Sequence, residues 1–122
     1  MVDDEPMLAQ MLVRMLTRLG YDVISRTSGI EALEMFRNQP NEKSFDLIIT
    51  DMTMPHLTGS DLAQKLSKLQ PEVKIILMTG FSEKIDAEKA KNLRIQGFLM
   101  KPVVSMDLAE TVRKVLDQKT EN

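Results

Sequence analysis

The feature that most constrains the fold is an alternation of short apolar runs with amphipathic stretches. Two of these runs, residues 45–50 (FDLIIT) and 73–78 (VKIILM), are compact and place apolar side chains at consecutive positions. Consecutive apolar residues suit a strand that is buried on both faces. Because helix-spaced stripes separate the runs, the chain predicts a parallel sheet with right-handed crossovers and helices on both faces.

Helix-spaced apolar residues and end signals predict where the other elements lie. A first helix starts at Pro6, which suits a first helical position, and stops at Gly20. Met7, Met11 and Met15 run beside its leucine stripe, and we interpret them as core filling. A second helix follows Ser28, which begins a capping-box pattern with Glu31. The remaining elements are strands at 21–26 and 98–100 and helices after Gly59, at 86–95 and at 105–116.

The first expected strand is nearly missing from the sequence. Met1 and Val2 alone precede Asp3, although an alternating fold needs a strand before the first helix. Two residues are too few for a central strand, so we expect the sequence to lack roughly four or five residues of it. The alternative is a first strand that is truly short, in a sheet that is destabilised for that reason.

Size and composition limit the classes of protein. A chain of 122 residues predicts one domain over 1–122, with 117–122 as a polar tail. A formal net charge of -2 offers no basic face, so we expect no direct binding to nucleic acid or anionic lipid. No cysteine is present, which excludes thiol chemistry. The apolar runs are far shorter than the ~20 residues of a membrane span, and we expect a cytoplasmic location.

Chemically useful side chains follow four different predicted strands. Asp3 and Asp4 follow the first strand, and Asp51, Thr79 and Lys101 follow the third, fourth and fifth. Each alone is an ordinary cap, turn or surface residue. The carboxyl ends of parallel strands meet at one edge of a sheet, where ligands bind, so we expect these side chains to converge.

Three carboxylates, one hydroxyl and one amine at one edge indicate phosphoryl chemistry. Close carboxylates repel one another unless a cation lies among them, and Mg²⁺ suits one or two carboxylates together with phosphate oxygens. Asp51 can act as the nucleophile, because aspartyl carboxylates form acyl phosphates. Lys101 and Mg²⁺ can neutralise the transferring group, and Thr79 can donate a hydrogen bond to it.

Four motifs together resemble the response-regulator receiver domain of two-component signalling. They are 2–6 (VDDEP), 51–55 (DMTMP) with Gly59 eight positions after Asp51, 79–80 (TG) and 101–102 (KP). The resemblance covers essentially the whole chain. It implies an α/β, flavodoxin-like, doubly wound sheet of five parallel strands in the order 2-1-3-4-5.

The same resemblance assigns roles to individual residues. It implies that Asp51 is the phosphoacceptor, that Asp3 and Asp4 help to hold Mg²⁺, and that the backbone carbonyl of Thr53 completes the metal shell. Thr79 and Lys101 would contact the phosphoryl group, and the chain would catalyse its own phosphorylation and slow dephosphorylation. The bond between Lys101 and Pro102 is usually cis in this family.

Phe98 resembles the switch aromatic of the family, although it has no hydroxyl group. We hypothesise that Thr79 moves toward the phosphoryl group, that Phe98 turns inward, and that the surface of the fourth helix, fifth strand and last helix is remodelled for an output partner. A core aromatic is the alternative for Phe98. The donor implied by the resemblance is a histidine kinase or phosphotransfer protein. Residues 99–102 and 107–110 look most similar to receivers of hybrid histidine kinases.

Two other classes of protein remain as alternatives. A phosphatase of the haloacid dehalogenase type also uses a strand-end aspartate, but it needs a second aspartate where this chain has Thr53. A non-phosphorylated interaction module that keeps the receiver fold is the other alternative, and the intact acidic, hydroxyl and amine positions argue against it.

Overall fold

A three-stranded parallel sheet forms the centre of the molecule. The computed structural model describes residues 1–38, 45–52, 54, 56–80 and 95–117. Within them lie β1 (Leu47–Asp51), β2 (Lys74–Thr79) and β3 (Gly97–Met100), ordered β1-β2-β3 with every pair parallel. All three strands fall within two residues of the predicted positions, so the apolar runs located the sheet correctly.

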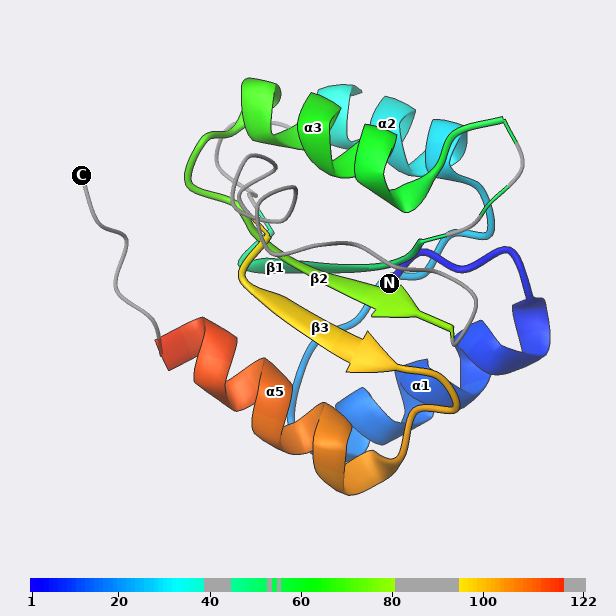
Figure 1. The fold of residues 1–122 in the computed structure, drawn as a ribbon, viewed down its shortest axis with the longest axis vertical. Helices are drawn as coiled ribbons and strands as arrows, with labels where there is room; N and C mark the ends of the chain where they lie inside the picture. Colours follow the sequence, from blue (N-terminus) through cyan, green and yellow to red (C-terminus); the bar gives the residue numbers. More distant parts are fainter. Residues whose placement is uncertain (39–44, 53, 55, 81–94, 118–122) are drawn as a thin grey trace.

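Helices cover both faces of this sheet (Figure 1). Helices α2 (Gly29–Asn38) and α3 (Gly59–Leu69) lie on one face, and α1 (Pro6–Arg18) and α5 (Ser105–Asp117) lie on the other. The predicted α/β class with helices on both faces is confirmed. Helix α5 includes Asp117, so the predicted tail begins one residue too early. The helix predicted at 86–95 falls outside the described residues except for its last position, Ile95, which is not helical.

The remaining two strand positions are occupied by single parallel bridges. Val2 bridges Thr50 of β1 on one side and Arg26 on the other. The segment 21–26 was predicted to be a strand, but among the described residues only Arg26 forms a bridge. The spatial order of segment 21–26, Val2, β1, β2 and β3 reproduces the predicted order 2-1-3-4-5. Each of these contacts is an isolated bridge, so among the described residues regular pairing is found in β1, β2 and β3.

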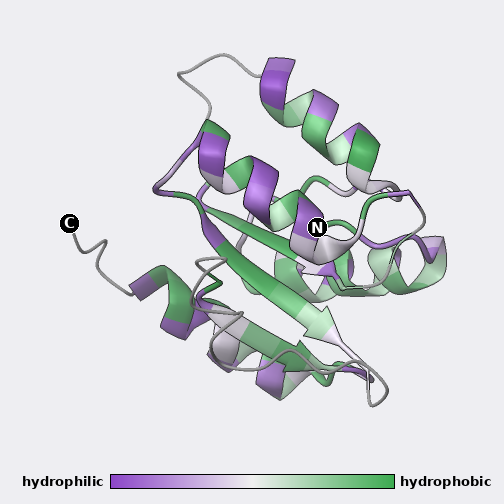
Figure 2. Ribbon diagram, turned by 45° about the horizontal axis from the view of Figure 1, so that its top comes forward, coloured by the Kyte–Doolittle hydropathy of each residue, from purple (hydrophilic) through white to green (hydrophobic). Residues whose placement is uncertain are grey.

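The core has two halves, one on each face of the sheet. Ile48 and Ile75 pack with α2 and α3, whereas the adjacent residues Ile49 and Ile76 pack with α1 and α5. Successive strand side chains point to opposite faces, so a sheet covered on both sides needs apolar residues at consecutive positions. Figure 2 shows this pattern, with hydrophobic strands between helices that carry hydrophilic outer faces.

The ends of the helices follow the signals in the sequence. Pro6 is the first residue of α1, and Gly20 beyond its end adopts a φ of 98°, a conformation that favours glycine. The Ser28 hydroxyl accepts hydrogen bonds from the N–H groups of Ile30 (3.2 Å) and Glu31 (3.4 Å) at the start of α2. The Thr58 hydroxyl accepts one from the Asp61 N–H at the start of α3. These caps fix where the connecting loops leave the helices.

The interpretation of the methionines on α1 as core residues is wrong for two of them. Met7 is 85% exposed and Met11 is 41% exposed, whereas Leu12 and Leu16 are buried. Met15 is partly buried and packs against the core on this face, so the interpretation holds for it and fails for the two methionines nearer the start of the helix. Among the described residues, no helix combines the length and the apolar character that a membrane span requires.

Candidate functional site

The predicted site residues lie at the carboxyl ends of neighbouring strands. Asp51 is the last residue of β1, Thr79 is the last residue of β2, and Lys101 directly follows β3. Asp3 directly follows the Val2 bridge, which lies next to β1. The parallel topology therefore brings residues from four distant parts of the chain to one edge, as the sequence predicted.

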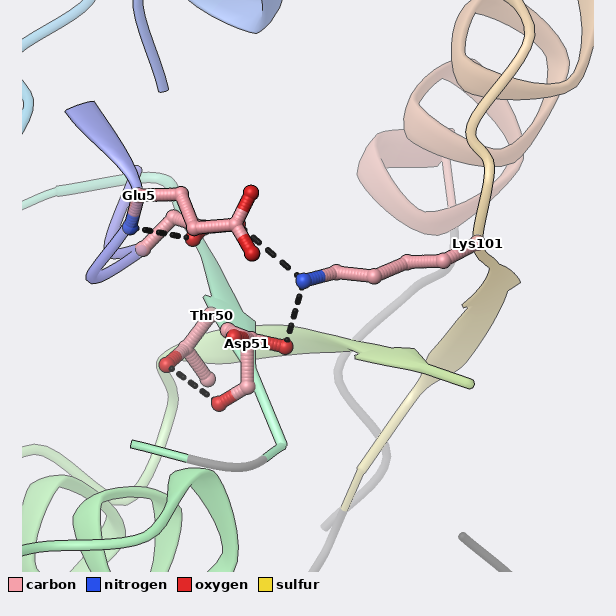
Figure 3. Close-up of polar contacts among 5 residues, drawn as sticks. Glu5, Thr50, Asp51 and Lys101 are labelled. Atoms are coloured by element: carbon pink, nitrogen blue, oxygen red, sulfur yellow. Dashed lines mark hydrogen bonds and ion pairs between the residues drawn. The ribbon is translucent and has the colours of Figure 1, made fainter. Parts of the chain in front are cut away.

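Lys101 joins the two buried aspartates. Its Nζ lies 2.9 Å from Asp51 Oδ1 and 3.4 Å from Asp3 Oδ2. Figure 3 shows the lysine side chain extending from the end of β3 toward Asp51 at the end of β1. The lysine side chain is 23% exposed, against 6% for Asp51 and 0% for Asp3. The ammonium group thus closes the partly open side of a buried acidic site.

A backbone N–H just before α1 holds the Asp3 carboxylate in place. Its Oδ1 accepts a hydrogen bond of 2.9 Å from the N–H of Glu5, which precedes α1. Its Oδ2 is buried and has no hydrogen-bond partner among the described residues, apart from the ion pair with Lys101. A buried carboxylate oxygen without a hydrogen bond is costly, so this atom is a candidate ligand for a cation.

The surroundings of Asp51 and Lys101 raise the pKa of both groups. Burial raises the pKa of Asp51 to about 6; the hydrogen bond from Lys101 opposes this shift, and the negative charges of Asp3 and Asp4 add to it. Burial alone would lower the pKa of Lys101, but its hydrogen bond and charge interactions with Asp51 and Asp3 outweigh burial and raise it. The lysine therefore stays charged, and further positive charge beside Asp51 would favour its ionised form.

The acidic residues also lie close enough together to hold one metal ion. One carboxylate oxygen from each of Asp3, Asp4 and Asp51 lies within 4.8 Å of the other two. Clustered carboxylates with an unpartnered buried oxygen suit a hard, oxygen-liganded cation such as Mg²⁺. The side chains present therefore fit the predicted ion.

Two further predicted residues, Thr79 and Phe98, lie within the described part of the chain. The backbone of Thr79 accepts a hydrogen bond of 2.8 Å from the Lys101 N–H, but within the described part of the chain its hydroxyl bonds neither Asp51 nor Lys101. Phe98 is 43% exposed, which contradicts the alternative of a core aromatic. Thr53 lies outside the described residues. The bond between Lys101 and Pro102 is cis, as the resemblance implied.

One supporting residue, Thr50, does not follow from the sequence, and a second, Gly59, makes a contact that its motif does not reveal. Thr50 is fully buried, and its hydroxyl donates a hydrogen bond of 3.2 Å to the Asp51 carbonyl oxygen. Its signal was a hydroxyl at the end of an otherwise apolar run, next to the candidate nucleophile. Gly59 was noted only for its spacing, yet its N–H donates a hydrogen bond of 2.8 Å to the Met52 carbonyl oxygen. This bond ties the start of α3 to the loop that follows Asp51.

Gly59→Ala is expected to lower the free energy of unfolding by about 1–3 kcal/mol, because an added Cβ overlaps the Asp51 backbone. The Cβ would lie only 3.0 Å from the Asp51 carbonyl carbon and 3.0 Å from Leu77 Cδ2. Urea unfolding measures the loss. Gly80→Ala is the matched control, since a Cβ there would meet no atom within 4 Å. Equal stability of the two variants would contradict the close packing at Gly59.

Comparison with known proteins decides the family. The model of the response regulator receiver domain matches residues 1–113, which include every residue of the site. The chain belongs to the receiver domain family. This assignment confirms the resemblance found in the sequence, and receiver domains are components of two-component signalling systems.

Relatives of this receiver domain occur in proteins of different architecture. Sensor kinase CckA of Brucella abortus (strain 2308) is 34% identical over 119 residues, which cover 98% of this chain and 12% of the kinase. Response regulator receiver protein CpdR of the same strain is 29% identical, covering 95% of this chain and 93% of CpdR. The chain spans between about a quarter and about half of the length of several other curated relatives.

A solved structure supports the receiver fold independently. The crystal structure of a response regulator receiver domain protein from Clostridium thermocellum superimposes with a TM-score of 0.86 at 31% sequence identity. The match covers 95% of this chain and 90% of that protein. The parallel sheet with helices on both faces is therefore the fold of a known receiver domain.

Proposed function

We propose that this receiver domain accepts a phosphoryl group on Asp51 from a histidine kinase or phosphotransfer protein, with Mg²⁺ bound beside it. It would thereby act as a phosphorylation-dependent switch, formed by residues 1–122 as one domain in the cytoplasm. The observation that best supports this role is the Lys101 ammonium group between two buried carboxylates, 2.9 Å from Asp51 and 3.4 Å from Asp3.

The transfer step exchanges one bond to phosphorus for another. A carboxylate oxygen of Asp51 attacks the phosphorus atom, the bond between phosphorus and the donor nitrogen breaks, and its electron pair stays on the donor imidazole. Such transfers depend mainly on positioning and on neutralising the equatorial phosphoryl oxygens. Lys101 provides a fixed positive charge for these oxygens, and Thr79 at the end of β2 is the candidate hydrogen-bond donor.

Asp3, Asp4 and Asp51 would hold the metal ion, and the Thr53 carbonyl is a further proposed ligand. When bound, Mg²⁺ supplies positive charge that offsets the repulsion among the carboxylates and the negative charge of the phosphoryl group. The unpartnered Oδ2 of Asp3 supports its part in this set. The backbone bond from Glu5 holds the other oxygen of Asp3 and so orients the carboxylate.

Intact mass measurement after incubation with Mg²⁺ and acetyl phosphate tests the proposal. We expect the chain to gain the mass of one phosphoryl group and peptide mapping to place it on Asp51. A chelator added in place of Mg²⁺ should prevent the gain. Modification of another residue, or none at all, would refute the switch and favour the non-phosphorylated interaction module. Steady release of inorganic phosphate from small esters would favour the phosphatase, for which Thr53 occupies the wrong position.

Phe98 is proposed to transmit phosphorylation to the output surface. Its side chain is largely outside the core on β3, so an inward rotation after movement of Thr79 would change the face shared with α5. Nuclear magnetic resonance with a phosphoryl mimic should give the largest shifts at Phe98, at 108–113 and at 87–94. Shifts confined to the residues around Asp51 would contradict this relay. The similarity to a sensor kinase supports a hybrid kinase as one candidate parent protein.

A further inference from the structure

The Thr50 hydroxyl is a buried polar group in an otherwise apolar part of β1. Thr50 is completely buried, and it directly follows the apolar residues Ile48 and Ile49. Strand side chains alternate between faces, so Thr50 lies on the same face as Ile48, which packs with α2 and α3. Burying a hydroxyl among apolar side chains is costly unless it forms a hydrogen bond. A valine would fill nearly the same volume without this cost, so packing alone does not account for the hydroxyl.

The hydroxyl bonds the backbone of the proposed phosphoacceptor (Figure 3). Thr50 Oγ1 donates a hydrogen bond of 3.2 Å to the Asp51 carbonyl oxygen. Among the described residues, no backbone N–H donates to this oxygen. Gly59 lies against it, because a Cβ added at Gly59 would overlap the Asp51 backbone. Asp51 as a whole is 5% exposed, so the enclosed oxygen depends on the Thr50 hydroxyl for its hydrogen bond.

Four hydrogen bonds hold the backbone of Asp51 and Met52, and the bond from Thr50 is one of them. The other three are backbone bonds of 2.8 or 2.9 Å: from the Asp51 N–H to Val2 O, from the Met52 N–H to Met78 O, and from the Gly59 N–H to Met52 O. They tie the end of β1 to the Val2 bridge, to β2 and to the start of α3. The bond from Thr50 is the member of this set that a side chain makes, so a substitution can remove it and leave the backbone bonds in place.

We infer that Thr50 is a positioning residue for the phosphoryl transfer proposed at Asp51. The bond of the Asp51 N–H holds the peptide unit before Asp51, and the Thr50 hydroxyl helps to hold the unit after it. Two fixed peptide units determine φ and ψ of Asp51, and therefore the direction of its Cα–Cβ bond. That direction places Asp51 Oδ1 at 2.9 Å from Lys101 Nζ. The effect of Thr50 on the transfer rate rests on the proposed function, whereas its effect on this distance does not.

Thr50→Val removes the hydroxyl and nearly keeps the shape of the side chain. The Asp51 carbonyl oxygen would then be buried without a donor, which favours rotation of its peptide unit. We expect kcat for phosphorylation by acetyl phosphate and Mg²⁺ to fall about 10-fold, because a misplaced nucleophile reacts slowly. KM for acetyl phosphate should not change, and Thr50→Ser, which keeps the hydroxyl, should retain the wild-type kcat. Crystal structures of wild type and Thr50→Val should show a longer distance between Lys101 Nζ and Asp51 Oδ1 in the variant.

Thr17→Val is the matched control, because Thr17 Oγ1 also donates to a carbonyl oxygen, that of Val13, but on the exposed side of α1. This control should keep the wild-type kcat. Urea unfolding verifies that each variant is folded, and Thr50→Ala, which also lacks the hydroxyl, replaces Thr50→Val if the latter is not.

A wild-type kcat in Thr50→Val, or an unchanged distance between Lys101 and Asp51, would overturn the positioning role. An equal loss of kcat in Thr50→Ser would also overturn it, since the hydroxyl would then not be the cause. A wild-type chain that gains no phosphoryl group would refute the proposed function instead, and the distance in the two crystal structures would then decide the role of Thr50.

Discussion

Asp51→Asn is expected to abolish the gain of a phosphoryl group from acetyl phosphate and Mg²⁺, the largest functional effect of any single change in this chain. Asparagine keeps the shape of the side chain but has no carboxylate to attack phosphorus. The other acidic residues do not compensate, because Asp3 Oδ1 is hydrogen-bonded to Glu5 and its Oδ2 faces the lysine. Intact mass measurement of wild type and variant in parallel gives the result.

The same variant is expected to be more stable than wild type when metal is removed by a chelator. Folding raises the pKa of Asp51 from 3.8 to about 6, so the folded state disfavours the ionised carboxylate. An acid with a raised pKa reduces stability as the pH rises from its unfolded value through its folded value. The asparagine side chain carries no such charge, so the gain in free energy of unfolding, on the order of 1 kcal/mol after allowing for solvent screening, should appear at pH 7 and vanish near pH 4.

An exposed acidic residue provides the control for both measurements. Asp61→Asn changes the same chemical group on α3, where the side chain is exposed. We expect this control to be phosphorylated as wild type is and to lack the stability gain at pH 7. Phosphorylation of Asp51→Asn to the wild-type extent would show that another residue is the acceptor.

Lys101→Met is expected to slow phosphorylation by about 10²-fold or more, the size of effect seen when one preorganised group that stabilises a transition state is removed. Methionine approximates the length of lysine without its charge. The variant would leave Asp3 and Asp51 facing each other without the ammonium group that lies within 3.4 Å of both. The metal-free chain should also lose stability at neutral pH, because two buried carboxylates would then lack their counter-charge.

The rate of the mass increase at a fixed acetyl phosphate concentration measures the effect of Lys101→Met. Lys65→Met is the matched control, because Lys65 is exposed on α3. The control should be phosphorylated at the wild-type rate. A Lys101→Met rate that equals the control rate would contradict a catalytic role for the ammonium group, whatever happens to stability.

The sequence predicted that these side chains converge because they occupy strand ends. The runs that end at Asp51 and Thr79 are apolar at consecutive positions, which identified them as buried strands before their partners were known. The carboxyl ends of parallel strands lie at the same edge of a sheet. That topology brings Lys101 near Asp51, and the two side chains form an ion pair of 2.9 Å. The distances themselves depend on side-chain packing, which a sequence pattern does not specify.

The sequence pattern does not predict which way some side chains face or how closely two elements approach each other. Phe98 belongs to an apolar run, yet the strand turns its ring outward, and a four-residue strand is too short for period-two alternation to reveal its faces. Met7 and Met11 have helical spacing like the leucines, but the rotation of α1 about its axis leaves them exposed. The tight approach of Gly59 to Asp51 is likewise a tertiary contact between separate elements.

The backbone bond from the Lys101 N–H to Thr79 O, 2.8 Å long, links the two strand ends that carry the ammonium and hydroxyl groups. A displacement of either strand end should therefore be transmitted to the other through a single peptide unit. An isotopic label at the Lys101 amide nitrogen would report movement at Thr79 without any substitution in the pocket. The Lys101 amide therefore offers a probe of the phosphorylated domain that leaves every side chain unchanged.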